Sequence, residues 1–133
     1  MVSVAILDDF ANAALRLADW SPVTRLATVQ VFNRHLEGRD MVAALQPFEI
    51  ICTLRERARI SREILEQLPN LKAIVVTDTR VRTIDNEAAA RRGILVCEGV
   101  APDDMPTAPT ATAEFAWGLL LATLRHLPEE AQR

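Results

Sequence analysis

Several features that would assign this 133-residue chain to a membrane, secreted or nucleic-acid-binding class are missing. The longest apolar run, residues 115–121, is far too short to cross a bilayer. The first residues enter a strand-like stretch without the basic and long apolar regions of a secretory signal. The net charge of −3 provides no positive field for nucleic acid. These absences predict a cytoplasmic protein that contacts neither membrane nor nucleic acid.

Cysteine and lysine are scarce. The two cysteines, Cys52 and Cys97, lie in strand-like runs, where a buried and inert thiol is more common than a disulfide or a metal ligand. Lys72 is the only lysine, and the arginines are scattered along the chain rather than grouped. We therefore expect no metal site, and we interpret the arginine bias as a property of the genome rather than as phosphate recognition.

The sequence does contain short β-branched runs that alternate with segments of helical period, over a length typical of one domain. Brief apolar runs predict strands at residues 2–7, 27–32, 49–54, 72–77 and 94–97. Helices are predicted at residues 12–18, 40–45, 61–68 and 85–92, with Ser61 and Asp85 as N-caps and Gly93 as a left-handed C-terminal residue. This alternation indicates a single α/β domain, residues 1–133, with a mostly parallel sheet covered on both faces.

A last helix, predicted at residues 111–126, differs from the others. Its apolar residues are spread around every face instead of forming one stripe. Such a helix has to be buried all round, and one face of a sheet cannot do this. We therefore expect the helix to need a second partner.

An acidic pair, Asp8-Asp9, follows the first predicted strand. Phospho-receiver domains hold Mg²⁺ with such a pair, but they also need an aspartate after the third strand and a lysine after the fifth. The third strand here ends in Thr53-Leu54, and Lys72 begins the fourth strand. A capping role for Asp9 at the start of the helix at residues 12–18 is the better interpretation, although both carboxylates lie at the edge of the sheet where α/β proteins bind ligands.

From Leu68 onward the sequence reads LPNLKAIVVTDTRVRTIDNEAAARRGILVCEGV and, further on, TAEFAWGLLLATLRHLPEE. The order and spacing of these segments, together with ILDDF near the start and RER after the third strand, resemble the D-isomer-specific 2-hydroxyacid dehydrogenases. The resemblance covers essentially the whole chain. It implies a flavodoxin-like substrate-binding domain that normally partners a Rossmann domain binding NAD or NADP.

The resemblance also implies what this chain cannot do alone. It has four glycines, Gly38, Gly93, Gly99 and Gly118, and no G-x-G-x-x-G, so we expect it to bind no dinucleotide by itself. The catalytic Arg, Glu and His of the family lie in the other domain. No catalytic residue is therefore assigned here, and His35 and His126 are interpreted as structural.

Residues for substrate binding are implied by the turn after the fourth strand, whose backbone N–H groups hold the substrate carboxylate in the family. The turn here includes Thr77, Asp78, Thr79 and Arg80. Asp78 stands where the family has Gly, and Val81 where it usually has Asn, so a carboxylate and a Cβ would repel and crowd a 2-oxo acid. Arg80 could offset that charge, and Arg55 and Arg57 follow the third strand on the same rim.

Two functions follow from this. One is the substrate-binding domain of a NAD-dependent oxidoreductase of 2-hydroxy or 2-oxo acids, inactive as this chain alone. The other is a flavodoxin-like binding or interaction module that has lost hydride chemistry, which the changes at Asp78 and Val81 favour. In either case the helix at residues 111–126 predicts a homodimer, because its apolar faces need cover.

Overall fold

The computed structural model describes residues 1–77, 82–99 and 108–127, with the side chains of residues 108–111 excepted. The chain divides into two compact units, Met1–Val100 and Ala101–Arg133, and each is described by itself. No helix within the described ranges is long and apolar enough to span a membrane.

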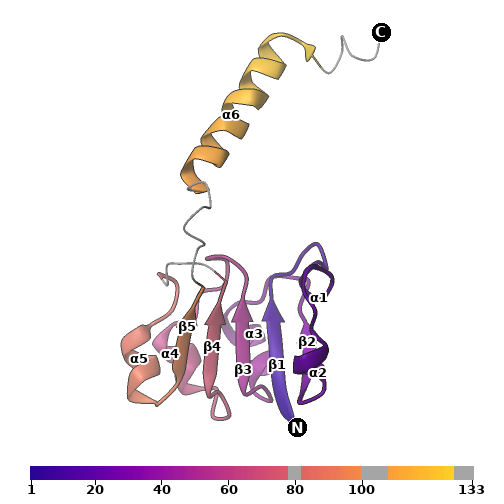
Figure 1. Ribbon diagram of the computed structural model, residues 1–133. Coiled ribbons are helices and arrows are strands. Elements are labelled where there is room, and N and C mark those ends of the chain that lie inside the picture. Colours follow the sequence, from indigo (N-terminus) through magenta and orange to yellow (C-terminus); the bar gives the residue numbers. More distant parts are fainter. Residues whose placement is uncertain (78–81, 100–107, 128–133) are drawn as a thin grey trace. The chain divides into compact units, whose positions relative to one another are not determined.

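The first unit alternates strands and helices along the chain (Figure 1). The strands are β1 (Val2–Leu7), β2 (Ala27–Val31), β3 (Ile50–Thr53), β4 (Ala73–Val76) and β5 (Leu95–Glu98). The helices are α1 (Ala14–Leu17), α2 (Ser21–Thr24), α3 (Gly38–Leu45), α4 (Arg62–Glu66) and α5 (Asn86–Arg91). All five strands predicted from the sequence are present within one residue at each end. Helix α2 was not predicted, and α1 is shorter than expected.

The five strands form one sheet in the order β2-β1-β3-β4-β5, and all four pairings are parallel. The register aligns Ile6 with Val31 and Cys52, and Thr53 with Val76. The sequence therefore predicted the parallel sheet correctly. Because every strand runs in the same direction, all the carboxyl ends meet at one edge, where the loops that follow them gather.

One face of the sheet carries the core. Figure 1 draws α3 and α4 fainter, behind the strands, and α5 contributes Ala88 and Ala89 to the same buried cluster. The strand residues that face this cluster are almost completely buried: Ala5, Leu7, Ile51, Ile74 and Val76. The helices contribute aliphatic side chains at helical spacing, among them Met41, Leu45 and Leu65.

The opposite face is covered unevenly within Met1–Val100. Over β1 its residues Val4 and Ile6 are buried. Over β4 and β5, however, Val75 is 38% exposed and Leu95 is 62% exposed. A parallel sheet normally has both faces covered, so this part of the sheet is an apolar surface that the first unit leaves open.

The ends of the helices show which predicted caps form. Asp85 caps α5 as predicted, since its Oδ1 accepts the N–H of Ala88 at 2.8 Å, and Gly93 has the expected positive φ of 68°. Ser61 occupies the N-cap position of α4 but makes no side-chain cap. Its hydroxyl donates instead to Glu63 Oε2 at 2.6 Å, because that carboxylate is a stronger acceptor within reach.

The second unit contains helix α6 (Ala108–Leu124), which begins three residues before the predicted position. Taken by itself, the helix carries large apolar side chains around its whole circumference, as the sequence predicted. Those of Phe115, Trp117, Leu119, Leu120, Leu121 and Leu124 are all exposed.

Candidate functional site

The carboxyl edge of the sheet is the candidate site, since ligands of open parallel sheets bind beyond the ends of their strands. The residues that follow β1, β2, β3 and β4 bring Asp8, His35, Arg55 and Thr77 to this edge. Three of the strand ends are joined by hydrogen bonds between side chains and backbone, which are described below.

The acidic pair after β1 divides two tasks. Asp9 accepts the N–H groups of Ala13 and Ala14, each at 2.9 Å, one on each carboxylate oxygen. These donors belong to the start of α1, so the predicted capping role of Asp9 is confirmed. Asp8 does not cap a helix. Its carboxylate is only 2% exposed and lies 2.8 Å from Nδ1 of His35.

Arg57 connects the loop after β3 to the end of β1. Its Nη1 donates to the carbonyl oxygen of Asp8 at 2.8 Å, and its guanidinium lies 5.2 Å from the centre of the Phe10 ring. A cation over an aromatic face and a hydrogen bond to a carbonyl fix the same side chain. The interpretation of Arg57 as a solvated surface residue on the rim is therefore too weak, because it holds two loops together.

The ends of β3 and β4 are joined through Thr77. Its hydroxyl donates to the carbonyl of Thr53 at 3.1 Å and accepts the N–H of Arg55 at 3.4 Å. Arg55 itself has a φ of 62°, a left-handed conformation that costs a non-glycine residue energy. Strain of this kind is found more often at functional sites than elsewhere. The side chain of Arg55 is exposed at the edge of the sheet.

Four of the residues singled out from the sequence, Asp78, Thr79, Arg80 and Val81, lie outside the described residues. The structure therefore places Arg55 and Thr77 of the predicted substrate-binding set side by side. The other three members of that set, Asp78, Thr79 and Arg80, remain predictions.

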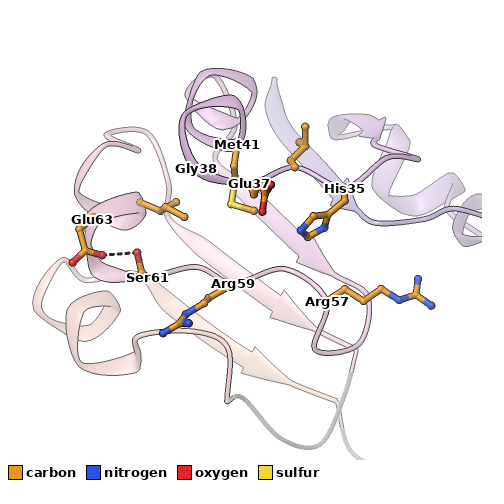
Figure 2. Close-up of a pocket in the computed structure, with 10 residues that line it drawn as sticks. His35, Glu37, Gly38, Met41, Arg57, Arg59, Ser61 and Glu63 are labelled. Atoms are coloured by element: carbon orange, nitrogen blue, oxygen red, sulfur yellow. Dashed lines mark hydrogen bonds between the residues drawn. The ribbon is translucent and has the colours of Figure 1, made fainter.

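A hollow of about 390 Å³ lies on the α3 and α4 side of this edge (Figure 2). Its polar lining comes from the loop after β2 and from the segment between β3 and α4: His35, Glu37, Arg57, Arg59, Ser61 and Glu63. In Figure 2 the ring of His35 points into this hollow, and Ser61 is bonded to Glu63 on the opposite side.

Metal and thiol chemistry find no support in the described part of the chain. It contains no group of three or more His, Cys, Asp or Glu side chains placed to hold a metal ion. Both cysteines are free thiols. Burial raises the pKa of Cys52 to about 11, so this thiol is largely unionised near neutral pH and is a poor nucleophile.

Comparison with known proteins gives the family. The sequence profile of the D-isomer specific 2-hydroxyacid dehydrogenase, catalytic domain, matches residues 4–125. This chain belongs to the D-isomer specific 2-hydroxyacid dehydrogenase family. The resemblance seen in the sequence is thereby confirmed over nearly the whole chain.

Individual relatives of this dehydrogenase domain agree with the match. A D-3-phosphoglycerate dehydrogenase of Methanocaldococcus jannaschii is 26% identical over 97% of this chain and 22% of its own length. A glyoxylate reductase of Pyrococcus furiosus is 41% identical over 71% of this chain and 26% of its own length. The structure of a phosphoglycerate oxidoreductase from Vibrio cholerae has a TM-score of 0.77 and 36% identity, covering 96% of this chain and 39% of that one. The dehydrogenase domain described here thus spans well under half the length of these relatives.

One pairing in this domain was missed from the sequence. His35 was interpreted as a structural residue in a polar loop, but the structure joins it to Asp8, 27 positions earlier. The two residues follow neighbouring strands of a parallel sheet, and this was the available signal, because carboxyl ends of neighbouring strands meet. The order of the strands was not known, so the signal could not be used.

Proposed function

We propose that this chain is the substrate-binding domain of a dehydrogenase that interconverts small 2-hydroxy and 2-oxo acids with a nicotinamide cofactor. The match of residues 4–125 to the catalytic domain of the family supports this most strongly. The relatives named glyoxylate reductase and hydroxypyruvate reductase favour a small 2-oxo acid as the substrate.

Within this proposal, Arg55 and Thr77 contribute to the site for the substrate carboxylate. Arg55 offers a planar guanidinium that suits a carboxylate, and its backbone is held in the left-handed conformation beside Thr77. Thr79 and Arg80 belong to the same proposed set, and Asp78 opposes it through its charge. Replacing Asp78 by Gly is therefore expected to improve the binding of a 2-oxo acid.

The cofactor does not fit the residues of this chain. A dinucleotide needs closely spaced glycines so that the backbone can approach its pyrophosphate. The nearest two glycines, Gly93 and Gly99, are six positions apart and lie on either side of β5. No step of the reaction is therefore assigned to a cofactor held by this chain, and NAD or NADP belongs to a separate dinucleotide-binding domain.

The test measures binding and turnover separately. Calorimetry of the chain with glyoxylate, and of Arg55→Gln, is expected to show weaker binding by the variant. NADH-dependent reduction of glyoxylate and hydroxypyruvate is expected to be absent for the chain alone and present in any longer protein that contains it. Arg39, which is exposed on α3, provides a matched control as Arg39→Gln.

A binding module without hydride chemistry is the second candidate. It is favoured by Asp78 and Val81, which stand at positions where the resemblance leads us to expect Gly and Asn. Under this alternative, neither the chain nor a longer protein that contains it reduces a 2-oxo acid, and Asp78→Gly does not improve the binding of glyoxylate.

A further inference from the structure

The hollow beside His35 lies where the topology of the sheet favours a ligand. The strand order β2-β1-β3 means that the chain leaves β1 toward one side and β3 toward the other. Loops that diverge in this way open a crevice at the carboxyl ends of the two strands, and many α/β proteins of this strand order bind ligands there. Asp8 follows β1, and Arg57 and Arg59 follow β3, so both sides of the crevice carry polar residues.

Asp8 is the unusual residue of this crevice. A carboxylate that is almost fully buried loses its hydration and has to be compensated by hydrogen bonds. The capping task at this end of β1 belongs to Asp9, so capping does not explain why Asp8 is buried. The side-chain partner that the described residues provide for Asp8 is His35, at 2.8 Å. Asp8 also has a φ of 57°, so the backbone is strained at the same point.

The buried carboxylate determines how His35 is presented. An ionised carboxylate only accepts hydrogen bonds, so Nδ1 of His35 carries the hydrogen that it donates to Asp8. Nε2 is left for another contact, and it has no partner among the described residues. The side chain of His35 is 46% exposed and faces the hollow (Figure 2). An imidazole oriented through one nitrogen, with the other directed at a cavity, is a common arrangement for contacting a ligand.

The charges around the hollow define what it could hold. Arg57 is occupied by the carbonyl of Asp8 and by Phe10, and Glu63 is occupied by Ser61. The guanidinium of Arg59 lines the hollow and forms no ion pair within the described residues. Glu37 is the carboxylate that opposes these cations.

We propose that this crevice binds an oxyanion group, a carboxylate or a phosphate, through Nε2 of His35 and the guanidinium of Arg59, with Asp8 holding the imidazole. The site goes beyond the proposed function. Asp8 ends β1, which is two strand spacings from β4, a separation of about 10 Å. A 2-oxo acid as small as glyoxylate that is bound at the end of β4 does not reach it. The occupant is either the far end of a longer substrate or a separate small anion.

The first experiment observes the imidazole directly. The protein is labelled with ¹⁵N-histidine and titrated with inorganic phosphate and, separately, with malonate. The chain has two histidines, so His126 serves as an internal reference, and His126→Gln assigns the two signals. We expect Nε2 of His35 to shift with saturation by at least one anion, while His126 stays unchanged. A larger response to phosphate indicates a phosphate-bearing ligand, and a larger response to malonate indicates a carboxylate.

The second experiment uses variants that keep the fold. Loss of one charge-assisted hydrogen bond is expected to weaken binding of the responding anion about tenfold or more in His35→Gln and Arg59→Gln. Glu37→Gln is expected to tighten it, because a repelling charge is removed. Asp8→Asn is expected to weaken it and to change the ¹⁵N shifts of His35 even without an anion, an effect that a purely structural role would not produce.

Some outcomes overturn the proposal. These are shifts of His35 no larger than those of His126 with both anions, or binding by His35→Gln within twofold of the parent at an unchanged melting temperature. Arg39→Gln, outside the hollow, controls for the loss of a positive charge. Glyoxylate binding that depends on Arg55 but not on His35 would leave the proposed function standing and remove this site, so the two failures are distinguishable.

Discussion

The two faces of the sheet carry equally apolar side chains but differ in burial. Neighbouring residues on β4 show this directly, because Ile74 is completely buried under the helices whereas Val75, on the other face, is 38% exposed. Strand residues alternate between faces, so the difference arises from what packs on each face and not from composition. An apolar face of a parallel sheet that is left open indicates a surface that receives a further segment or partner.

Helix α6 extends this comparison. By itself it presents apolar side chains on every side, whereas α3 buries Met41, Val42 and Leu45 along one stripe. We propose that a second copy of the chain covers α6, most simply in a two-fold dimer. The following predictions test the contrast between buried and open apolar surface, beginning with the largest effect.

The first prediction concerns assembly. Trp117→Lys is expected to convert a dimer into a monomer, because each large side chain buried at such a contact contributes about 1.5–3 kcal/mol and a lysine would have to be desolvated. Sedimentation velocity at micromolar concentration measures this. Glu114→Lys changes the charge of the same helix without removing an apolar side chain and should remain dimeric. A monomeric parent chain would contradict the proposal.

The second prediction compares the two faces of β4. Ile74→Ala is expected to lower the free energy of unfolding by about 2–5 kcal/mol, because it leaves a cavity in the core. Val75→Ala, one residue later, should cost less than about 1 kcal/mol if its face is open to solvent. Urea unfolding of both variants provides the comparison. A large cost at Val75 would mean that its face is covered in solution.

The third prediction uses pH, at a residue on the less covered face. Burial raises the pKa of Cys52 from 9.0 to about 11, so the folded protein holds this proton more tightly than the unfolded chain does. The stabilisation is complete below pH 9 and is lost as the pH rises toward 11, by up to about 2–3 kcal/mol. The free energy of unfolding should therefore fall more steeply over this window in the parent than in Cys52→Ala. Parallel curves for the two proteins would show that the thiol is not buried.

The fourth and smallest effect compares a side chain that caps a helix with one that does not. Asp9→Ala removes the acceptors for two N–H groups of α1 and should cost about 1 kcal/mol. Ser61→Ala removes a hydroxyl that bonds only to Glu63, so its effect should be within about 0.5 kcal/mol. Thermal unfolding of both variants measures the difference, and equal losses would contradict these assignments.

Much of the fold could be predicted because its signals are local. Each strand is a brief apolar run and each long helix has its period, so the strands were located within one residue. Asp85 and Asp9 were recognised as caps because capping depends on residues only a few positions apart. Helix α2 was not predicted, since its four residues, with Pro22 in the first turn, are too few to show a helical period.

The candidate site could be predicted only in part. Arg55 and Thr77 followed from the family resemblance, and the structure places them in contact. The pairing of Asp8 with His35 and the anchoring of Asp8 by Arg57 were not foreseen, because these residues are 27 and 49 positions apart. Contacts at such separations depend on which strands are neighbours, and a list of strands does not contain that order.

The sequence by itself determined the class of the fold, the position of each strand and the family, because periodicity, caps and motif order are properties of nearby residues. Only the tertiary structure decided that β1 lies between β2 and β3. That order brings the loops after these strands together, buries Asp8 against His35 and opens the crevice beside them. The physical reason is that a parallel sheet joins residues through strand neighbours, and the choice of neighbours is made by packing of the whole domain.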